Sequence, residues 1–380
     1  MMRIIEPVFD GSELDNLKEC FESGWVTQGP RVAEFESIVA EKHKVKHALA
    51  TTSCTAGLHL SALALGLGPG DEVIVPSFTW ITSANCAEYV GAKAVLVDVD
   101  PDTYNLDIAA FENAITENTR AVVAVHLFGM PANMDAIREI SNKNNLYIIE
   151  DAACALGTLY KNTPIGGMGD VAVFSFHPRK VITTGEGGMI TTNNESISKL
   201  IDSLRNHGST GLSPEDKDDP KPYSMATFNN LGYNLRMSDI QAAVGVAQMS
   251  KFEYLLSERR KYADRYNYLL SEIDEIQTPV VGNESKGHSY QSYVIRVLKG
   301  GQNTRNKIME DLSEKKIETR PGTLAVHRCG YYAEKYNYRP DEIPNATLCA
   351  ETTITLPLFH NMNESDLINV VDSIKASIFN

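Results

Sequence analysis

The chain has 380 residues, of which 43% are apolar and 22% are charged. This composition is typical of a globular protein with a large core, and the length favours two domains. The 49 acidic and 35 basic residues give a net charge of −14, which argues against non-specific binding to nucleic acid or to an anionic membrane surface. An anionic ligand would therefore need a locally basic site.

The six cysteines are scattered along the chain, without a CxxC pair or a Cys/His cluster at zinc spacing. They are expected to be reduced thiols, with neither a disulfide framework nor a metal site. No apolar segment reaches bilayer length, and the N-terminus has no apolar signal core. The sequence predicts a soluble cytoplasmic protein.

Short apolar segments alternate with helical patterns through the first two thirds of the chain. Strands are expected at Glu72–Pro76, Ala94–Val97, Ala121–His126, Tyr147–Glu150, Val171–Phe176 and Met189–Thr192, and helices at Thr55–Leu67, Ile108–Ile115 and Met134–Asn142. The alternation predicts an α/β fold whose mostly parallel central sheet has helices on both faces. Because such sheets bind ligands beyond the carboxyl ends of their strands, the loops that follow these strands are the expected functional region.

A single long helix is predicted to begin near Ser238, and the composition changes beyond it. The next expected elements are a strand and an amphipathic helix, at Tyr290–Leu298 and Thr304–Lys315. We therefore expect a large domain over residues 1–249 and a smaller C-terminal α+β domain over residues 250–380. The polar, proline-containing segment Ser209–Tyr223 is expected to be a mobile surface loop near the mouth of the ligand site.

The segment Ser175–Gly188 could carry a nucleophile. The preceding strand delivers Ser175 to the edge of the sheet, a short loop presents Lys180, and a glycine-rich turn returns the chain into the next strand. A lysine surrounded by apolar chain can lose its proton and act as a nucleophilic amine. On this segment alone, an exposed loop lysine beside an ordinary hairpin is the simpler interpretation.

Three further strand ends carry polar or aromatic residues. Asp151 could pair with a protonated heterocyclic nitrogen, or it could cap a helix. The small hydroxyl residues around Thr55 lead into an apolar helix whose N-terminus could bind phosphate, or they could simply cap it. Trp80 could stack on a planar ring or pack in the core. Together with Lys180, these groups form the set that pyridoxal 5′-phosphate requires.

Longer motifs extend over nearly the whole chain: SGWVTQGP (Ser23–Pro30), TSCTAGLHL (Thr52–Leu60), GDEVIVPSFTW (Gly70–Trp80), VHLFGMPANMDAI (Val125–Ile137), IIEDAA (Ile148–Ala153), FSFHPRKVITTGEGGM (Phe174–Met189), GYNLRMSDIQAA (Gly232–Ala243) and ETRPGTLAVH (Glu318–His327). In these motifs the chain resembles the DegT/DnrJ/EryC1/StrS family of sugar aminotransferases. The FSFHPRKVITTGEGG stretch is the most specific of them. The resemblance implies fold type I of the pyridoxal-phosphate enzymes.

The resemblance implies a role for each matching residue. Lys180 would form the internal aldimine and then move the proton between the α-carbon of the amino donor and C4′ of the cofactor. Asp151 would keep the pyridine nitrogen protonated, and Trp80 would lie over the ring. The family often has His or Gln where this chain has Cys154, which would lie next to the cofactor and could alter its contacts.

The phosphate of the cofactor would be bound from two subunits. Within one chain, the resemblance assigns it to Ser175 and to Thr55 and Ala56 at the start of a helix. Asn234 would reach the phosphate of the neighbouring subunit's cofactor. The resemblance therefore implies a homodimer with active sites at the subunit interface.

The resemblance also implies the reaction. L-Glutamate would convert the cofactor to pyridoxamine 5′-phosphate, and the amino group would then pass to a nucleotide-linked keto sugar, most commonly a 4-keto-6-deoxyhexose. His327 and Arg320 lie where the family contacts the sugar nucleotide. Such amino sugars serve the biosynthesis of surface polysaccharides such as lipopolysaccharide O-antigen or capsule.

Other interpretations remain. A 3-keto sugar or a cyclitol ketone could be the substrate. A pyridoxamine-phosphate-dependent 3-dehydratase of the same fold would carry His in place of Lys180. A non-catalytic regulator or binding protein would lack Lys180, Asp151 or the phosphate-binding residues, all of which are present. A nicotinamide-dependent dehydrogenase also alternates strands and helices, but no GxGxxG follows the first predicted strand.

Overall fold

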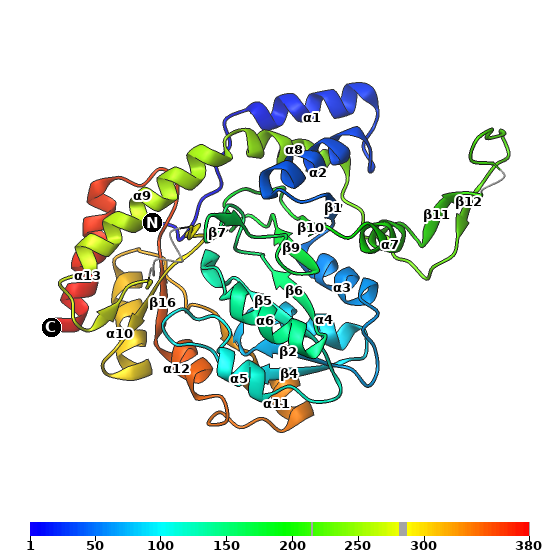
Figure 1. Ribbon diagram of the computed structural model, residues 1–380. Coiled ribbons are helices and arrows are strands. Elements are labelled where there is room, and N and C mark those ends of the chain that lie inside the picture. Colours follow the sequence, from blue (N-terminus) through cyan, green and yellow to red (C-terminus); the bar gives the residue numbers. More distant parts are fainter. Residues whose placement is uncertain (214–215, 281–286, 380) are drawn as a thin grey trace.

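The centre of the molecule is a seven-stranded sheet with the strand order β1-β10-β9-β6-β5-β2-β4. It is seen in a computed structural model that describes residues 1–213, 216–280 and 287–379 (Figure 1). The strands are His47–Thr51 (β1), Glu72–Pro76 (β2), Lys93–Val97 (β4), Thr119–Val125 (β5), Tyr147–Asp151 (β6), Val171–Ser175 (β9) and Gly188–Thr192 (β10). Strand β10 runs antiparallel to both of its neighbours, and the other neighbouring strands are parallel.

The sheet confirms the predicted α/β class and each of the strands predicted for it. Strand β2 has the predicted bounds, and the bounds of the others differ by at most two residues. Strand β1 was not predicted, because its sequence HALAT contains only one β-branched residue.

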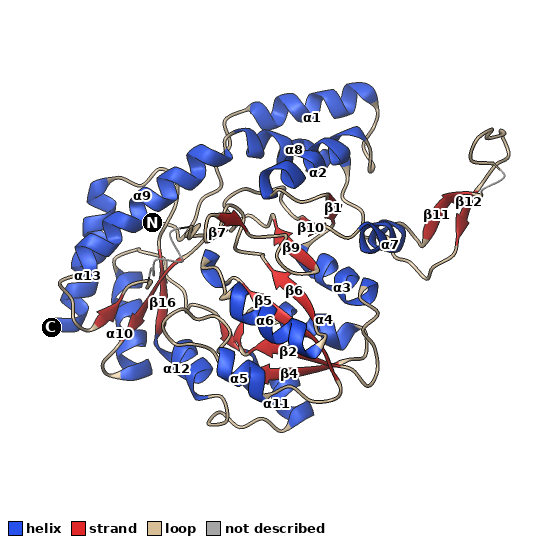
Figure 2. Cartoon of the chain, in the orientation of Figure 1, coloured by secondary structure: helices blue, strands red, loops and turns tan. Residues whose placement is uncertain are grey.

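Helices cover both faces of the sheet and create one apolar core on each (Figure 2). They are Pro30–His43 (α2), Cys54–Ala64 (α3), Thr82–Tyr89 (α4), Ile108–Asn113 (α5), Met134–Asn144 (α6) and Glu195–Arg205 (α7). Alternate strand residues serve the two cores: Val73 and Val75 belong to the core with α3 and α4, and Ile74 to the core with α2 and α6. Burial on both faces explains the continuous apolar sequence of these strands.

The predicted long helix is wrong in one respect, because it is two helices. Helix α8 (Asp239–Ser250) ends at Lys251, whose backbone leaves the helical region at φ −105° and ψ 4°, and α9 (Phe252–Leu270) follows. The Lys251 amine lies 2.6 Å from Glu13 and 2.8 Å from Asp10 at the start of α1 (Ser12–Ser23). The predicted start is confirmed, since Ser238 caps α8.

A smaller antiparallel sheet and its own apolar core lie in the C-terminal part of the chain. Its strands are Ile276–Gln277 (β13), Tyr293–Val297 (β14) and Thr353–Leu356 (β16), and the helices beside it are Gly301–Glu314 (α10) and Glu364–Phe379 (α13). The strand and the helix expected here are thus present with slightly shifted bounds. Both termini lie beside this sheet (Figure 1), where Met2 pairs with Ile317. A division into domains 1–249 and 250–380 stays a prediction.

Other C-terminal elements pack on the large sheet instead. They are Leu324–Ala325 (β15), Val326–Arg328 (η2), Gly330–Tyr336 (α11) and Pro344–Thr352 (α12). Strand β15 pairs with β3 (Phe78–Thr79), and Tyr332 and Cys349 belong to the core that contains α3. Three short elements lie earlier in the chain, at Leu127–Gly129 (η1), Leu159–Tyr160 (β7) and Thr163–Pro164 (β8). The C-terminal part of the chain therefore adds residues to the apolar core on the α3 side of the large sheet.

A hairpin that we call the arm, Ser209–Leu212 (β11) and Ala226–Phe228 (β12), projects from the body beyond α7 (Figure 1). Its strands are antiparallel, and the hydroxyls of Thr210 and Thr227 lie 2.9 Å apart across them. The predicted surface loop 209–223 thus begins as a strand of the arm, and positions 214–215 fall outside the described residues. Within the described part, the segment does not line the cavity of its own chain, so its expected place at that mouth is wrong.

None of the described helices is both long enough and apolar enough to cross a membrane.

Candidate active site

The loops after β2, β5, β6 and β9 surround a cavity of about 490 Å³. They lie at the carboxyl ends of parallel strands, where this class of sheet binds ligands. The predicted site residues that line this cavity are Thr55, Trp80, Asp151, Cys154, Ser175 and Lys180. Residues from strand ends far apart in the sequence are therefore brought together as expected.

Lys180 lies in the loop after β9, with its amine inside the cavity. Its backbone N–H donates to the carbonyl of His177 at 2.8 Å, and its Nζ lies 3.2 Å from Cys154 Sγ. Burial alone would lower the pKa of Lys180, but the sulfur of Cys154 and the carboxylate of Asp151 outweigh it, and the pKa is raised above its usual value. Among the chain's own residues, the burial that favours release of the proton of Lys180 is thus opposed by its neighbours, and its nucleophilic role stays a prediction.

The glycine-rich turn after Lys180 fits the chain against the start of α3. Gly185 has φ +80°, in the left-handed region that favours glycine. A Cβ at Gly188 would lie 2.5 Å from the carbonyl carbon of Ser53 and 2.6 Å from the nitrogen of Cys54. Only glycine leaves room for β10 to pass so close to this helix N-terminus, which explains the TTGEGG motif.

Asp151 ends β6 and is only 5% exposed. Its Oδ2 accepts a hydrogen bond from Ser83 Oγ at 2.6 Å, and its Oδ1 accepts one from the backbone N–H of Ala153 at 3.1 Å. Thr79 Oγ1 lies 2.9 Å from Ser83 Oγ, so two buried hydroxyls stand in line behind the carboxylate. Donors to both oxygens fix the plane of the carboxylate, as a partner of one ring nitrogen requires.

The neighbouring carboxylate, Glu150, has a structural role on the other face of the sheet. It is fully buried, bonds to His126 Nε2 at 3.1 Å and accepts N–H groups from residues 166, 168 and 169. Burial alone would raise the pKa of Glu150, but its hydrogen bond to His126 outweighs this and the pKa is lowered. Of the two carboxylates that end β6, only Asp151 is available to a ligand in the cavity.

Helix α3 points its N-terminus at the cavity. Its cap is Ser53, whose Oγ accepts the backbone N–H of Ala56 at 3.1 Å. The N–H groups of Cys54 and Thr55, in the first turn, have no partner within the helix and carry its positive dipole end. Together with Ser175, which also lines the cavity, they are placed where they could bind a phosphate. The predicted role of Ala56 stays a prediction, since its N–H is already bonded to the cap.

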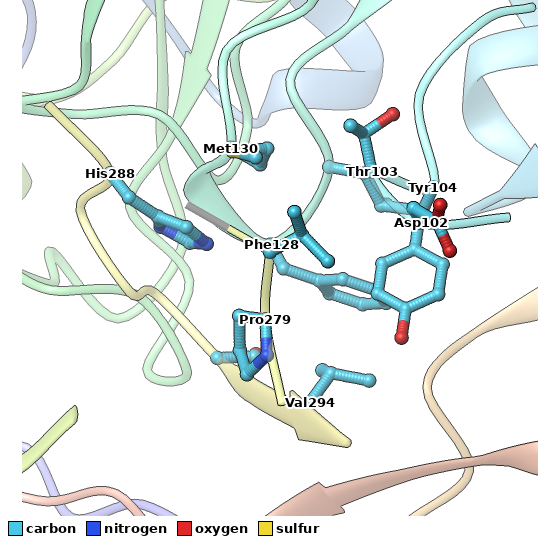
Figure 3. A pocket seen from close by; sticks show the side chains of 11 residues that line it. Asp102, Thr103, Tyr104, Phe128, Met130, Pro279, His288 and Val294 are labelled. Carbon is cyan, nitrogen blue, oxygen red and sulfur yellow. The ribbon is translucent and has the colours of Figure 1, made fainter. Parts of the chain in front are cut away.

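Aromatic side chains form the rim and one wall of the cavity. Trp80 follows β3 at the rim and is 59% exposed. Phe128 lines the cavity and also a second space of about 10 Å³, close to the smallest that holds one water (Figure 3). Phe128 adopts φ +58°, rare for a bulky residue, and its ring packs edge-on against Tyr104 at 5.8 Å. This wall separates the cavity from β14.

Besides Ala56, three predicted site residues do not line the cavity of their own chain, as far as the structure describes it. His327 is 1% exposed, and its ring nitrogens lie 2.8 Å from Ser77 Oγ and 3.1 Å from Thr347 Oγ1. Arg320 lines an adjoining space of about 110 Å³. Asn234 is exposed at the base of the arm. Their contacts with a substrate or a neighbouring subunit stay predictions.

The sequence reasoning missed Ser83 and Thr79, which complete the surroundings of Asp151. Thr79 ends β3 and Ser83 lies in the first turn of α4, so no helical periodicity signalled that their hydroxyls meet. The contact with Asp151 could not be seen, because it joins α4 to the distant strand β6.

Comparison with known proteins gives the same assignment. The model of the DegT/DnrJ/EryC1/StrS aminotransferase family matches residues 7–375. The chain is similar to the GDP-perosamine synthase of Caulobacter vibrioides, at 38% identity over 97% of this chain and 96% of that protein. It is also similar to the spore coat polysaccharide biosynthesis protein SpsC of Bacillus subtilis, at 35% identity over 97% and 95% of the two chains.

Among solved structures, the chain is similar to the putative sugar aminotransferase Spr1654 from Streptococcus pneumoniae in its PMP form. The TM-score is 0.94 at 28% identity, and 99% of each chain is covered. The PLP form of the same protein gives a TM-score of 0.92. The likeness therefore extends to structures with the cofactor in both of its forms.

The residues of the cavity suit pyridoxal 5′-phosphate. A primary amine at Lys180, a buried and oriented carboxylate at Asp151, and unpaired N–H groups at the start of α3 are the groups that its aldehyde, ring nitrogen and phosphate require. From the cavity and the comparisons together, we conclude that the chain belongs to the DegT/DnrJ/EryC1/StrS aminotransferase family and is a pyridoxal-phosphate-dependent sugar aminotransferase.

Proposed function

We propose that the protein transfers the amino group of L-glutamate to a nucleotide-linked keto sugar, with an NDP-4-keto-6-deoxyhexose as the preferred acceptor. The observation that carries this proposal is the meeting of Lys180, Asp151 and the start of α3 in one cavity of about 490 Å³. The similarity to a GDP-perosamine synthase supports a sugar nucleotide as the acceptor.

The chain's own residues supply binding, orientation and proton transfer. Pyridoxal phosphate, when bound, supplies the electron sink that stabilises negative charge at the α-carbon of the amino donor. Lys180 holds the proton that must leave the donor carbon and later reach the sugar carbon, and Cys154 contacts its amine at 3.2 Å. Asp151 would keep the ring nitrogen protonated, and Ser175 with the start of α3 would hold the phosphate, which orients the cofactor in the cavity that Lys180 lines.

The acceptor would enter between the two parts of the chain. Gln291, Ser292, Gly322 and Thr323, which follow α9 in the sequence, line the same cavity as Lys180. Their amide, hydroxyl and backbone groups can donate to and accept from sugar hydroxyls. The cavity thus combines a cofactor floor from the large sheet with a polar opposite wall, which suits a sugar ring better than an apolar substrate.

We further propose that the active unit is a homodimer. The residues from the arm to Asn234 expose large apolar side chains, with Tyr223 80%, Met225 76% and Leu231 89% exposed. Exposed apolar groups on a projecting hairpin are costly in water, and a second copy of the chain would cover them. Asn234 at the base of the arm would then approach the partner's cofactor. Sedimentation of a monomer at micromolar concentration would contradict this proposal.

The test is nitrogen transfer from ¹⁵N-labelled L-glutamate to UDP-, GDP- and dTDP-linked 4-keto-6-deoxyhexoses, followed by mass spectrometry of the nucleotide sugar. We expect one labelled nitrogen in place of the keto oxygen for at least one acceptor. Labelling of 3-keto sugars or cyclitol ketones alone would move the assignment to those substrates. Loss of water without label would indicate a 3-dehydratase, and no conversion with bound cofactor would indicate a binding protein.

A further inference from the structure

We propose that Arg179 and Arg320 form a carboxylate site that recognises the distal carboxylate of a dicarboxylic amino donor. This inference rests on the proposed function and names the feature of the site that selects its donor. Arg179 precedes Lys180 and lines both the main cavity and the adjoining space of about 110 Å³ that Arg320 lines. Arg179 therefore lies where the two spaces meet, and Arg320 lies beside it in the smaller one.

The guanidinium of Arg179 has no hydrogen-bond or ion-pair partner among the residues that the structure describes. Its backbone is nevertheless held, because the carbonyl accepts Gln291 Nε2 at 2.8 Å and the N–H donates to His177 Nδ1 at 3.2 Å. A guanidinium carries five donors in a planar fork that matches a carboxylate. Arg179 is exposed and lines both spaces, so its guanidinium is free to meet a ligand there while its backbone stays fixed.

Arg320 approaches the same place from the C-terminal part of the chain. Its backbone pairs with that of Thr355 in β16 through hydrogen bonds of 2.6 and 3.3 Å. Its guanidinium meets one acceptor, Glu318 Oε1 at 3.3 Å, while Glu318 Oε2 accepts the N–H of Ile4. Most of the donors of Arg320 are thus available to a ligand.

The two guanidinium groups are close enough to affect each other. Burial and then the charge of Arg320 lower the pKa of Arg179, and Glu318 opposes this only in part. No carboxylate lines the adjoining space in the described part of the chain. The junction is therefore a locally basic place in a chain of net charge −14, and a bound anion would relieve the repulsion between its cations.

The size and lining of the adjoining space favour a carboxylate over a nucleotide. Its volume of about 110 Å³ is less than a quarter of the 490 Å³ of the main cavity, which suits a carboxyl group on a short methylene chain. Ile4, Ile5, Leu356 and Leu358 supply apolar walls for the methylenes.

The first test measures binding of glutarate, a dicarboxylate that lacks an amino group, to the pyridoxal-phosphate-loaded protein by calorimetry. Charge-assisted hydrogen bonds of this kind lead us to expect a roughly tenfold or larger rise in the dissociation constant for R179Q and for R320Q. R328Q is the matched control, because Arg328 pairs with Glu351 at 2.7 Å and does not line either space. Equal glutarate affinity in all variants would overturn the proposal.

The second test compares L-glutamate with L-norvaline, which lacks the distal carboxylate, as donors that remove the yellow absorbance of the bound cofactor. Loss of the two guanidinium groups should slow the reaction with glutamate about tenfold or more and leave norvaline unchanged. An equal fall for both donors, or weaker binding of GDP in place of glutarate, would contradict the proposal. If glutarate binds as expected but no sugar is aminated, the proposed function fails and this site stands.

Discussion

Replacing Ser83 by alanine removes the donor that holds Asp151 Oδ2. The hydrogen bond is 2.6 Å long, and Ser83 and Asp151 are 0% and 5% exposed, so water cannot take the place of the lost hydroxyl. A hydrogen bond to a charged group contributes about 1.5–3 kcal/mol. This corresponds to a change of roughly 10- to 150-fold in an equilibrium constant.

The loss should appear as weaker binding of pyridoxal phosphate. Without Ser83, the carboxylate of Asp151 keeps only the N–H of Ala153 and must be ordered when the cofactor binds, which costs binding free energy. We expect the dissociation constant of S83A to rise about tenfold or more. The measurement is an absorbance titration of the apoprotein with pyridoxal phosphate at neutral pH.

Two controls separate this effect from general damage. S61A makes the same substitution in α3, where Ser61 is fully buried but its hydroxyl has no hydrogen-bond partner in the described chain, so cofactor affinity should not change. An analogue with carbon in place of the ring nitrogen does not use Asp151, so S83A should bind it as wild type does. Unchanged affinity of S83A for pyridoxal phosphate, or an equal loss with the analogue, would refute the account of Asp151.

Three further predictions concern other parts of the chain. G188A should weaken both the fold and phosphate binding, because its Cβ would lie 2.5 Å from the carbonyl carbon of Ser53. We expect urea denaturation to show a free energy of unfolding lower by about 1–3 kcal/mol. Unchanged stability would contradict the close approach of β10 to α3. Burial lowers the pKa of His43 to about 4, so the folded protein favours the neutral imidazole. Below pH 6.5 the unfolded chain binds a proton that the folded protein does not, and the free energy of unfolding therefore falls between pH 6.5 and pH 4. The loss from this group is about 2 kcal/mol at pH 5, and H43Q should flatten the profile of unfolding free energy against pH; an unchanged profile would show that His43 does not contribute. N234A should release pyridoxal phosphate faster than the wild-type protein during dialysis, and equal retention would contradict the proposed cross-subunit contact.

The sequence was sufficient where function depends on residues at the ends of strongly apolar strands. Asp151 and Lys180 follow such strands, and the direction of parallel strands alone brings them to one edge of the sheet. The helix start at α3 that lines the cavity was also visible, because small hydroxyl residues before an apolar helix are a local signal, and its role in phosphate binding stays a prediction.

The sequence was insufficient where the deciding contact is tertiary. The periodic apolar pattern continues through Lys251, but ion pairs to Asp10 and Glu13 hold this residue where the helix breaks. The apolar sequence around Lys180 indicates only burial, which lowers its pKa. The opposing effect of Cys154, whose Sγ lies 3.2 Å from the amine, comes from another loop and could not be seen in the sequence.

The central claim is that Lys180 and the cavity around it carry the amino group from donor to acceptor. The most direct measurement is the absorbance spectrum of the purified protein, before and after L-glutamate, beside that of K180A. We predict a yellow band that gives way to the pyridoxamine form in the wild-type protein, and a folded K180A that shows an altered band and no turnover. A protein that stays colourless after addition of pyridoxal phosphate, or a K180A variant with normal turnover, would contradict the account.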